Sequence, residues 1–138
     1  MRFTTNLFSL LLLTFFVVAS SFTNVKSNTA AGPWRFLADK SVRFGVDRDV
    51  IIFGNWKDDV RQLKLKVTDG PLKMYSMTVH FDNGSTQNVA LKNNFAQGSW
   101  SRVIDVDGGL RHLSKIEFVY ETKGFVRGRS RIAVWGKQ

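Results

Sequence analysis

From residue 33 onward, apolar and polar residues alternate in short segments along the chain. The clearest segment is 63–67, where Leu63, Leu65 and Val67 are separated by Lys64 and Lys66. Because successive side chains of a β-strand point to opposite faces, this pattern predicts a strand with its apolar side chains buried and its lysines outside. Similar alternation, or a short β-branched run, predicts strands within 34–44, 50–53, 74–81, 86–91, 100–106, 113–121 and 129–135.

Turn residues separate these segments. Asp82-Asn83-Gly84-Ser85 predicts a hairpin between 74–81 and 86–91, since Asn-Gly is the strongest short-range hairpin signal. No segment has a sustained helical period. We therefore expect an all-β fold, an antiparallel β-sandwich of the jelly-roll type with about eight strands, as one domain over 33–137.

The inward phase of these strands predicts the core. In 74–81 the alternation places Tyr75, Met77, Val79 and Phe81 on one face, opposite Ser76, Thr78 and His80. The phenylalanines expected in the core are Phe44, Phe53, Phe81 and Phe118.

The first residues have another character. Arg2 precedes the apolar run Leu7–Val18, and small or polar residues follow it. This order is typical of a secretory signal peptide, which we place at 1–27 with cleavage somewhere within 19–31. An uncleaved anchor over Leu7–Phe22 is the alternative, although the run is shorter than the ~20 residues that span a bilayer. We expect a secreted or periplasmic protein.

The chain is strongly basic. Its formal net charge is +9, and leaving out Arg2 and Lys26 of the leader lowers it to +7. Such an excess favours an anionic partner, such as an acidic glycan, a phospholipid headgroup, polyphosphate or nucleic acid. Export argues against nucleic acid. The alternative is that the charge only keeps a small domain soluble.

A row of arginines lies near the C-terminus, in the segment VRGRSRIAVW. If Ser130, Ile132 and Val134 point inward, the arginines and Trp135 share the outer face. Guanidinium groups bind carboxylate, sulfate or phosphate in a planar, two-pronged way, so the row predicts an anion-binding face. Arginine also protects exposed strand edges from aggregation, which is the simpler interpretation. Lys64 and Lys66 are expected to form a second basic face.

Signals for catalysis are weak. The lack of cysteine excludes thiol catalysis and disulfides, and it favours a bacterial envelope over an animal secreted protein. Neither His80 nor His112 has a metal-ligand spacing. The D-x-D-G stretch at 105–108 could bind calcium but lacks the rest of a calcium loop.

Trp56 and Trp100 follow turn or loop residues, where an indole can form a carbohydrate platform or can cover the end of the core.

Several stretches carry a resemblance to a known family. They are Trp34–Leu37, Val42–Ile51, Arg102–Gly109, Phe118–Tyr120 and Ala133–Gly136. Together they resemble a family of small exported bacterial proteins of unknown function, each a signal peptide followed by one all-β domain. The resemblance covers most of the chain after the leader. It implies an exported β-sandwich, and it assigns no functional residues.

We therefore expect a non-catalytic binding module for an anionic or carbohydrate polymer, without cofactor or metal. One alternative is an envelope component that contacts another protein. Another is a glycan-acting hydrolase or lyase, which would need Asp47, Asp49, Asp58, Asp59 or Glu117 to converge with a histidine or tyrosine. The residues expected to bind are Arg127, Arg129, Arg131, Trp135, Lys64, Lys66, Trp56 and Trp100.

Overall fold

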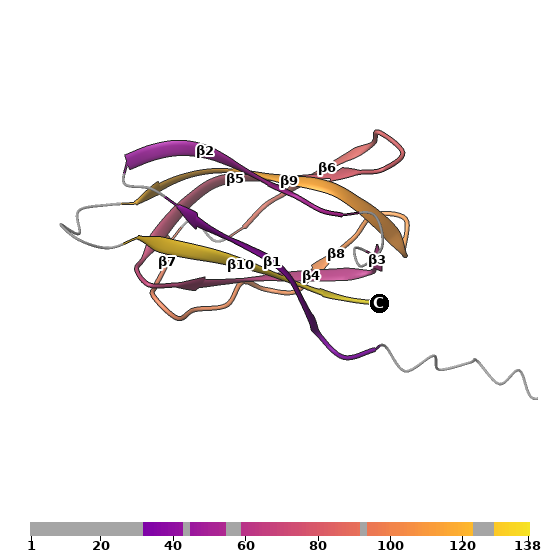
Figure 1. The fold of residues 1–138 in the computed structure, drawn as a ribbon, viewed down its shortest axis with the longest axis horizontal. Helices are drawn as coiled ribbons and strands as arrows, with labels where there is room; N and C mark the ends of the chain where they lie inside the picture. The colour runs from indigo at the N-terminus through magenta and orange to yellow at the C-terminus, as the bar shows by residue number, and fades with distance from the viewer. Residues whose placement is uncertain (1–31, 43–44, 55–58, 92–93, 123–128) are drawn as a thin grey trace, which may run out of the picture.

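The chain forms two antiparallel β-sheets packed face to face (Figure 1). The computed structural model describes residues 32–42, 45–54, 59–91, 94–122 and 129–138. The four-stranded sheet has the order β1 (Arg35–Val42), β10 (Ser130–Lys137), β4 (Gln62–Thr68) and β8 (Ile104–Asp105). The second sheet has the order β2 (Gly45–Ile52), β9 (Arg111–Thr122), β5 (Leu72–Phe81) and β6 (Thr86–Val89), with β3 (Asp59–Val60) paired to β9 and β7 (Asn94–Phe95) paired to β5.

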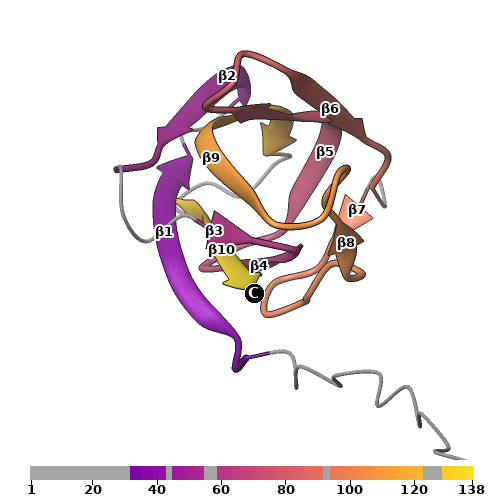
Figure 2. The same ribbon diagram turned by 90° about the vertical axis from the view of Figure 1, so that its right-hand side faces the viewer.

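The two strand orders correspond position by position. The first strand in the two orders is β1 or β2, the second is β10 or β9, the third is β4 or β5, and the fourth is β8 or β6. Most strands that follow each other in the sequence therefore belong to different sheets, and the chain crosses repeatedly from one sheet to the other (Figure 2). This is the jelly-roll arrangement. The predicted all-β antiparallel sandwich is confirmed, with eight strands in the two main orders and two further strands of two residues each. Among the described residues no helix is long and apolar enough to cross a membrane.

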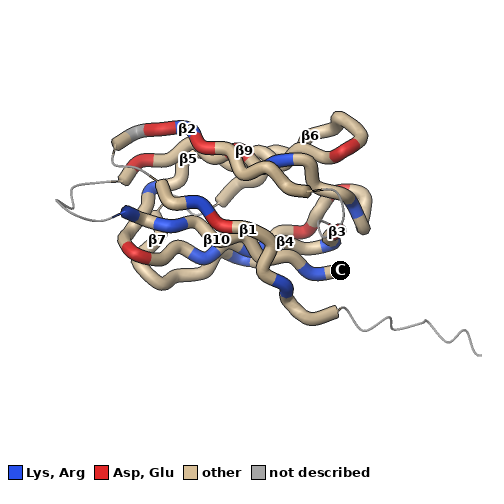
Figure 3. Tube along the Cα trace, in the orientation of Figure 1, with Lys and Arg blue, Asp and Glu red and all other residues tan. Residues whose placement is uncertain are grey.

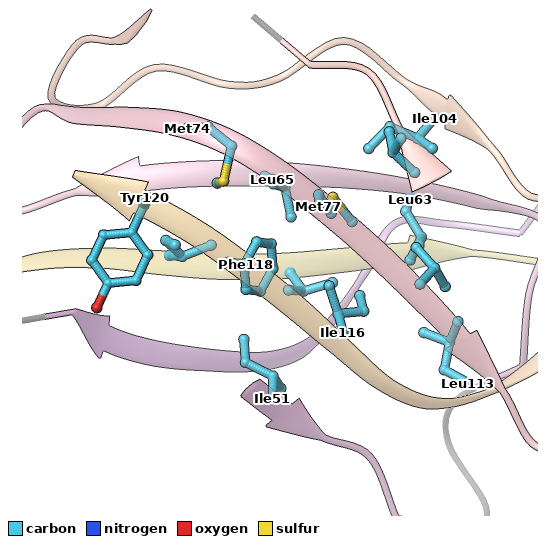
Figure 4. Close-up of a cluster of buried hydrophobic side chains, with 14 of the residues drawn as sticks. Ile51, Leu63, Leu65, Met74, Met77, Ile104, Leu113, Ile116, Phe118 and Tyr120 are labelled. Atoms are coloured by element: carbon cyan, nitrogen blue, oxygen red, sulfur yellow. The ribbon is translucent and has the colours of Figure 1, made fainter. Parts of the chain in front are cut away.

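The core lies between the sheets (Figure 4). Leu63 and Leu65 of β4 and Phe118 of β9 are fully buried, as the alternation predicts. Phe53 and Phe81 also belong to the core, so these predictions are confirmed, whereas Phe44 lies outside the described residues. Removal of this apolar surface from water is the main force that holds the sheets together.

The prediction for the faces of 74–81 is wrong at Tyr75. The register of β5 against β9 shifts between Met74 and Ser76, which marks a β-bulge. A bulge inserts one extra residue and reverses the alternation on one side of it. Met74 is therefore buried, while Tyr75 is 49% exposed.

The predicted strand at 100–106 is also wrong in its extent. Only Ile104–Asp105 forms a strand there, and Trp100 makes an isolated bridge to Lys66.

The hairpin at the Asn-Gly turn is confirmed, because the Phe81 N–H donates to the Ser85 carbonyl at 2.9 Å and Gly84 has a φ of 86°. The predicted leader, 1–27, lies outside the described residues.

Candidate functional site

Residues that the sequence pattern assigned to two basic faces lie on one. In the β10–β4 ladder, Trp135 is paired with Lys64, Ala133 with Lys66 and Arg131 with Thr68. Directly paired residues of neighbouring strands point to the same face of a sheet. Since Leu63, Leu65, Ile132 and Val134 point into the core, these pairs lie on the outer face of the four-stranded sheet. Figure 3 shows the Lys and Arg positions along β4 and β10 in the layer that this sheet forms.

Three aromatic rings follow one another across this outer face. Trp135 contacts Phe36 with ring centres 5.6 Å apart and Trp100 with ring centres 5.8 Å apart, both edge to face. Phe36 is 51% exposed and Trp100 is 42% exposed, so the two outer rings present apolar surface to solvent. Trp135 lies between them, and its indole N–H is buried without an acceptor among the described residues.

Three lysines lie against the indole rings of the same face. Lys64 Nζ is 4.4 Å from the ring centre of Trp34 and 4.2 Å from that of Trp100. Lys66 Nζ is 5.0 Å from the centre of Trp100, and Lys137 Nζ is 5.8 Å from that of Trp34. Such distances allow cation–π attraction. We call this surface the Lys–Trp face; it consists of Trp34, Phe36, Lys64, Lys66, Trp100, Trp135 and Lys137.

Among the described residues, no carboxylate forms an ion pair with these lysines. In the part of the chain that the structure describes, ion pairs form at Lys40, Lys115 and Arg131, and none forms at Lys64, Lys66 or Lys137. Their charge is therefore available to an anionic group from outside.

Hydrogen bonds of the residues on both sides of Trp100 fix its backbone against β4. The Ser101 N–H donates to the Leu65 carbonyl at 2.8 Å, and the Leu65 N–H donates to the Ser101 hydroxyl at 2.8 Å. On the other side, the Val67 N–H donates to the Ser99 carbonyl at 3.0 Å. The indole is thus placed against β4 before any ligand arrives, which lowers the ordering cost of binding.

The arginine row has a different environment from the lysines. Arg131 forms ion pairs with Asp39 of β1 and, at 3.6 Å, with Asp69 of the turn after β4. The hydrogen bond to Asp39 is the main reason why the pKa of Arg131 is raised above its ordinary value. Arg129 is exposed just before β10, and Arg127 lies outside the described residues, as does Trp56. Arg131 therefore ties three segments together, and its charge is already balanced.

Sequence reasoning missed three members of the face: Trp34, Phe36 and Lys137. Lys137 continues the outward phase of Arg131, Ala133 and Trp135 by one step, so it could have been found from the alternation alone. Trp34 and Phe36 join the face only through the pairing of β1 with β10, in which Phe36 lies opposite Trp135. No local pattern reports that pairing.

The acidic residues named for a catalytic site meet different partners. The Tyr120 hydroxyl donates to Asp49 at 2.5 Å, His112 contacts Asp59, and His80 Nε2 is 3.5 Å from a Glu117 oxygen. The three pairs occupy separate positions along β9. Asp47 is exposed on β2, and Asp58 lies outside the described residues.

No group of three or more histidine, aspartate or glutamate side chains that could hold a metal occurs among the residues described. A pocket of about 410 Å³ lies over β5 and β6, lined by residues 74–77 and 88–91. None of these lining residues is a histidine or a carboxylate. The pocket therefore brings together no acid–base pair.

The fold and the site define an all-β jelly-roll domain with a cationic and aromatic outer face. The chain belongs to the family described as Domain of unknown function (DUF2541), which matches residues 9–136. The predicted membership in a family without an assigned activity is confirmed, while the bacterial and exported character stays a prediction.

Other comparisons add little. No curated protein matches the chain significantly. Among solved structures, the chain is similar to one described as the structure of infectious bursal disease virus Gx strain, with 15% identity and a TM-score of 0.31. The match covers 76% of this chain and 32% of the viral chain, so this chain spans about a third of the viral one. A likeness at this TM-score supports no conclusion about fold or function.

Proposed function

We propose that this domain is a non-catalytic binding module whose Lys–Trp face binds an anionic carbohydrate polymer. The observation that carries the proposal is the placement of Lys64, Lys66 and Lys137 on indole rings without a carboxylate partner in the described residues. Gathering three like charges on one surface is unfavourable unless something offsets their repulsion. A cation–π contact at an exposed site contributes only about 0.5–1 kcal/mol, so an anionic ligand would add substantially to this balance.

The aromatic rings favour a carbohydrate among anionic ligands. Phe36 and Trp100 expose apolar ring surface beside the ammonium groups. A sugar ring has an apolar face of C–H groups that can stack on such a surface, while its sulfate or carboxylate groups can reach a lysine. An inorganic polyanion would use the lysines and leave the rings unused.

The distribution of acid and base groups supports binding over catalysis. General acid–base chemistry needs two such groups within reach of one substrate atom. The described pairs Asp49–Tyr120, Asp59–His112 and Glu117–His80 are made by strands of the second sheet. The Lys–Trp face belongs to the first sheet and contains lysines and aromatic residues.

Export is part of the proposal and rests on the leader pattern at 1–27. An extracellular or periplasmic location would bring the Lys–Trp face to envelope or environmental glycans. Mass spectrometry of the protein recovered from cells and medium tests this step. We expect the mature chain to begin within 20–32, and recovery of the intact leader on a cytosolic protein would overturn it.

Binding is tested by the affinity of the purified protein for a sulfated glycan, with neutral dextran as the reference. The double variant Lys64→Gln, Lys66→Gln removes two charges from the face. The matched control, Lys73→Gln, Lys115→Gln, removes two charges from the second sheet. We expect the first to weaken binding at least about tenfold and the control to change it far less. Equal losses, or no binding by the unsubstituted protein, would contradict the proposal.

A further inference from the structure

The β4–β10 ladder carries one cation at each of its outward steps. Gln62 is paired with Lys137, Lys64 with Trp135, Lys66 with Ala133 and Thr68 with Arg131. The cation comes from β10 at the two ends and from β4 in the middle. Outward residues of a strand recur about every 7 Å, so four positive groups follow one another along the strand direction at roughly this spacing.

Three of the four cations have no carboxylate partner in the part of the chain that the structure describes. Arg131, at one end, is already paired with Asp39 and Asp69. At the other end, the Gln62 side chain next to Lys137 donates to Asp105 of β8 at 2.9 Å. Carboxylates thus flank a row of three ammonium groups that have no ion-pair partner among the described residues, about 14 Å from first to last along the strands.

Indole rings alternate with these ammonium groups. Trp34 contacts both Lys137 and Lys64, and Trp100 contacts both Lys64 and Lys66. The order along the ladder is therefore Lys137, Trp34, Lys64, Trp100, Lys66. A ligand that follows this row meets a positive group and an aromatic ring in turn.

We propose that the ligand is a linear anionic glycan that lies along the β4–β10 ladder and places three successive anionic groups on Lys137, Lys64 and Lys66. This inference rests on the proposed function and adds to it a direction, a minimum length and a register. The polymer runs parallel to the strands, and its sugar rings pass over Trp34 and Trp100. Fragments with fewer than three anionic groups along this path cannot fill the row.

The first test is a length series. Size-fractionated oligosaccharides of one sulfated glycan, from disaccharide upward, are titrated into the protein by calorimetry. We expect affinity to rise steeply until the fragment spans about 14 Å and then to increase only slowly. Beyond that length, a longer chain only offers more ways to place three of its anionic groups on the same three lysines. Affinity that is the same for the disaccharide and the long chain would overturn the ladder path while leaving the binding function intact.

The second test uses the salt dependence of binding. Each lysine that contacts the polymer contributes to the slope of log K against log salt concentration, so the single changes Lys64→Gln, Lys66→Gln and Lys137→Gln should each lower the slope by about one. Arg131→Gln is the matched control on the same ladder, and it should leave the slope unchanged. A slope that falls equally for Arg131→Gln would overturn the three-step row. Thermal melting confirms that each variant is folded.

Two other polyanions separate the sources of affinity. Polyphosphate of equal charge lacks rings, so it should bind more weakly than the glycan. A single-stranded oligonucleotide offers both charge and rings, because bases can stack on aromatic side chains. Binding of the oligonucleotide more tightly than the glycan would reassign the face to nucleic acid. Absence of binding to every polyanion would instead remove the proposed function itself.

Discussion

The ammonium nitrogen of Lys64 lies 4.2 Å from the ring centre of Trp100, although the strands β5, β6 and β7 lie between the two residues in the sequence. Backbone hydrogen bonds between β4 and residues 98–101 create this contact. The lysine charge and the indole ring are therefore presented together by two segments that are hydrogen-bonded to each other. Changes to either residue can be separated from changes to the core, which makes the proposed site accessible to substitution.

Trp100→Ala should weaken glycan binding while the protein stays folded. Trp100 is 42% exposed, and among the described residues it makes one edge-to-face contact and two cation–π contacts. We expect a loss of about 1–2 kcal/mol in the free energy of unfolding, measured by urea denaturation. Val103→Ala is the control, since Val103 is 45% exposed on the loop that follows and belongs to no part of the Lys–Trp face. Unchanged glycan affinity in Trp100→Ala would argue against the face.

Neighbouring residues of β4 should behave in opposite ways. Leu65 is fully buried between the sheets, so Leu65→Ala should cost about 2–5 kcal/mol of unfolding free energy through the cavity that it leaves. Lys66 points outward, and Lys66→Gln should change stability by less than about 0.5 kcal/mol. Chemical denaturation of the two variants checks the inward–outward assignment. A comparable loss in both would show that the strand is packed differently.

Gly136 of β10 should tolerate no side chain. A Cβ atom at this position would lie 2.4 Å from Val60 Cγ1 and 2.8 Å from Leu37 Cδ1, both closer than atoms can approach without a shift. We expect Gly136→Ala to destabilise the fold by about 1–3 kcal/mol, as overpacking of a core does. Gly54→Ala is the control, because a Cβ there meets open space. A melting temperature that falls equally in both variants would contradict this account.

The acid stability of the fold should depend on Glu117. Its pKa is lowered from the ordinary value of 4.5, mainly by the hydrogen bond from Lys115, with a smaller contribution from His80. A carboxyl whose pKa is depressed in the folded state stabilises the fold above the unfolded value, and this stabilisation is lost as the pH falls through the folded value. Thermal melting as a function of pH should therefore show a shallower acid decline in Glu117→Gln. An identical decline in the two proteins would exclude this contribution.

Much of the architecture follows from local alternation. The inward phase of Leu63, Leu65 and Val67 and that of Ile132 and Val134 are both as predicted, because the faces of a strand depend only on its own period of two. The pattern failed where this period breaks. At Tyr75 a bulge shifts the phase, and the very short strands β3 and β7 contain too few residues to alternate.

The sequence by itself determined an all-β chain, its basic charge and the outward direction of Lys64, Lys66 and Trp135. Only the tertiary structure decided that these residues share one face, because the pairing of β10 with β4 joins strands far apart in the chain. It also decided which cations are open: Asp39 and Asp69 reach Arg131 through the fold, while no described carboxylate reaches Lys64. Strand register and ion pairing are non-local, since they depend on which segments pack together, and a single strand's pattern contains no record of its neighbours.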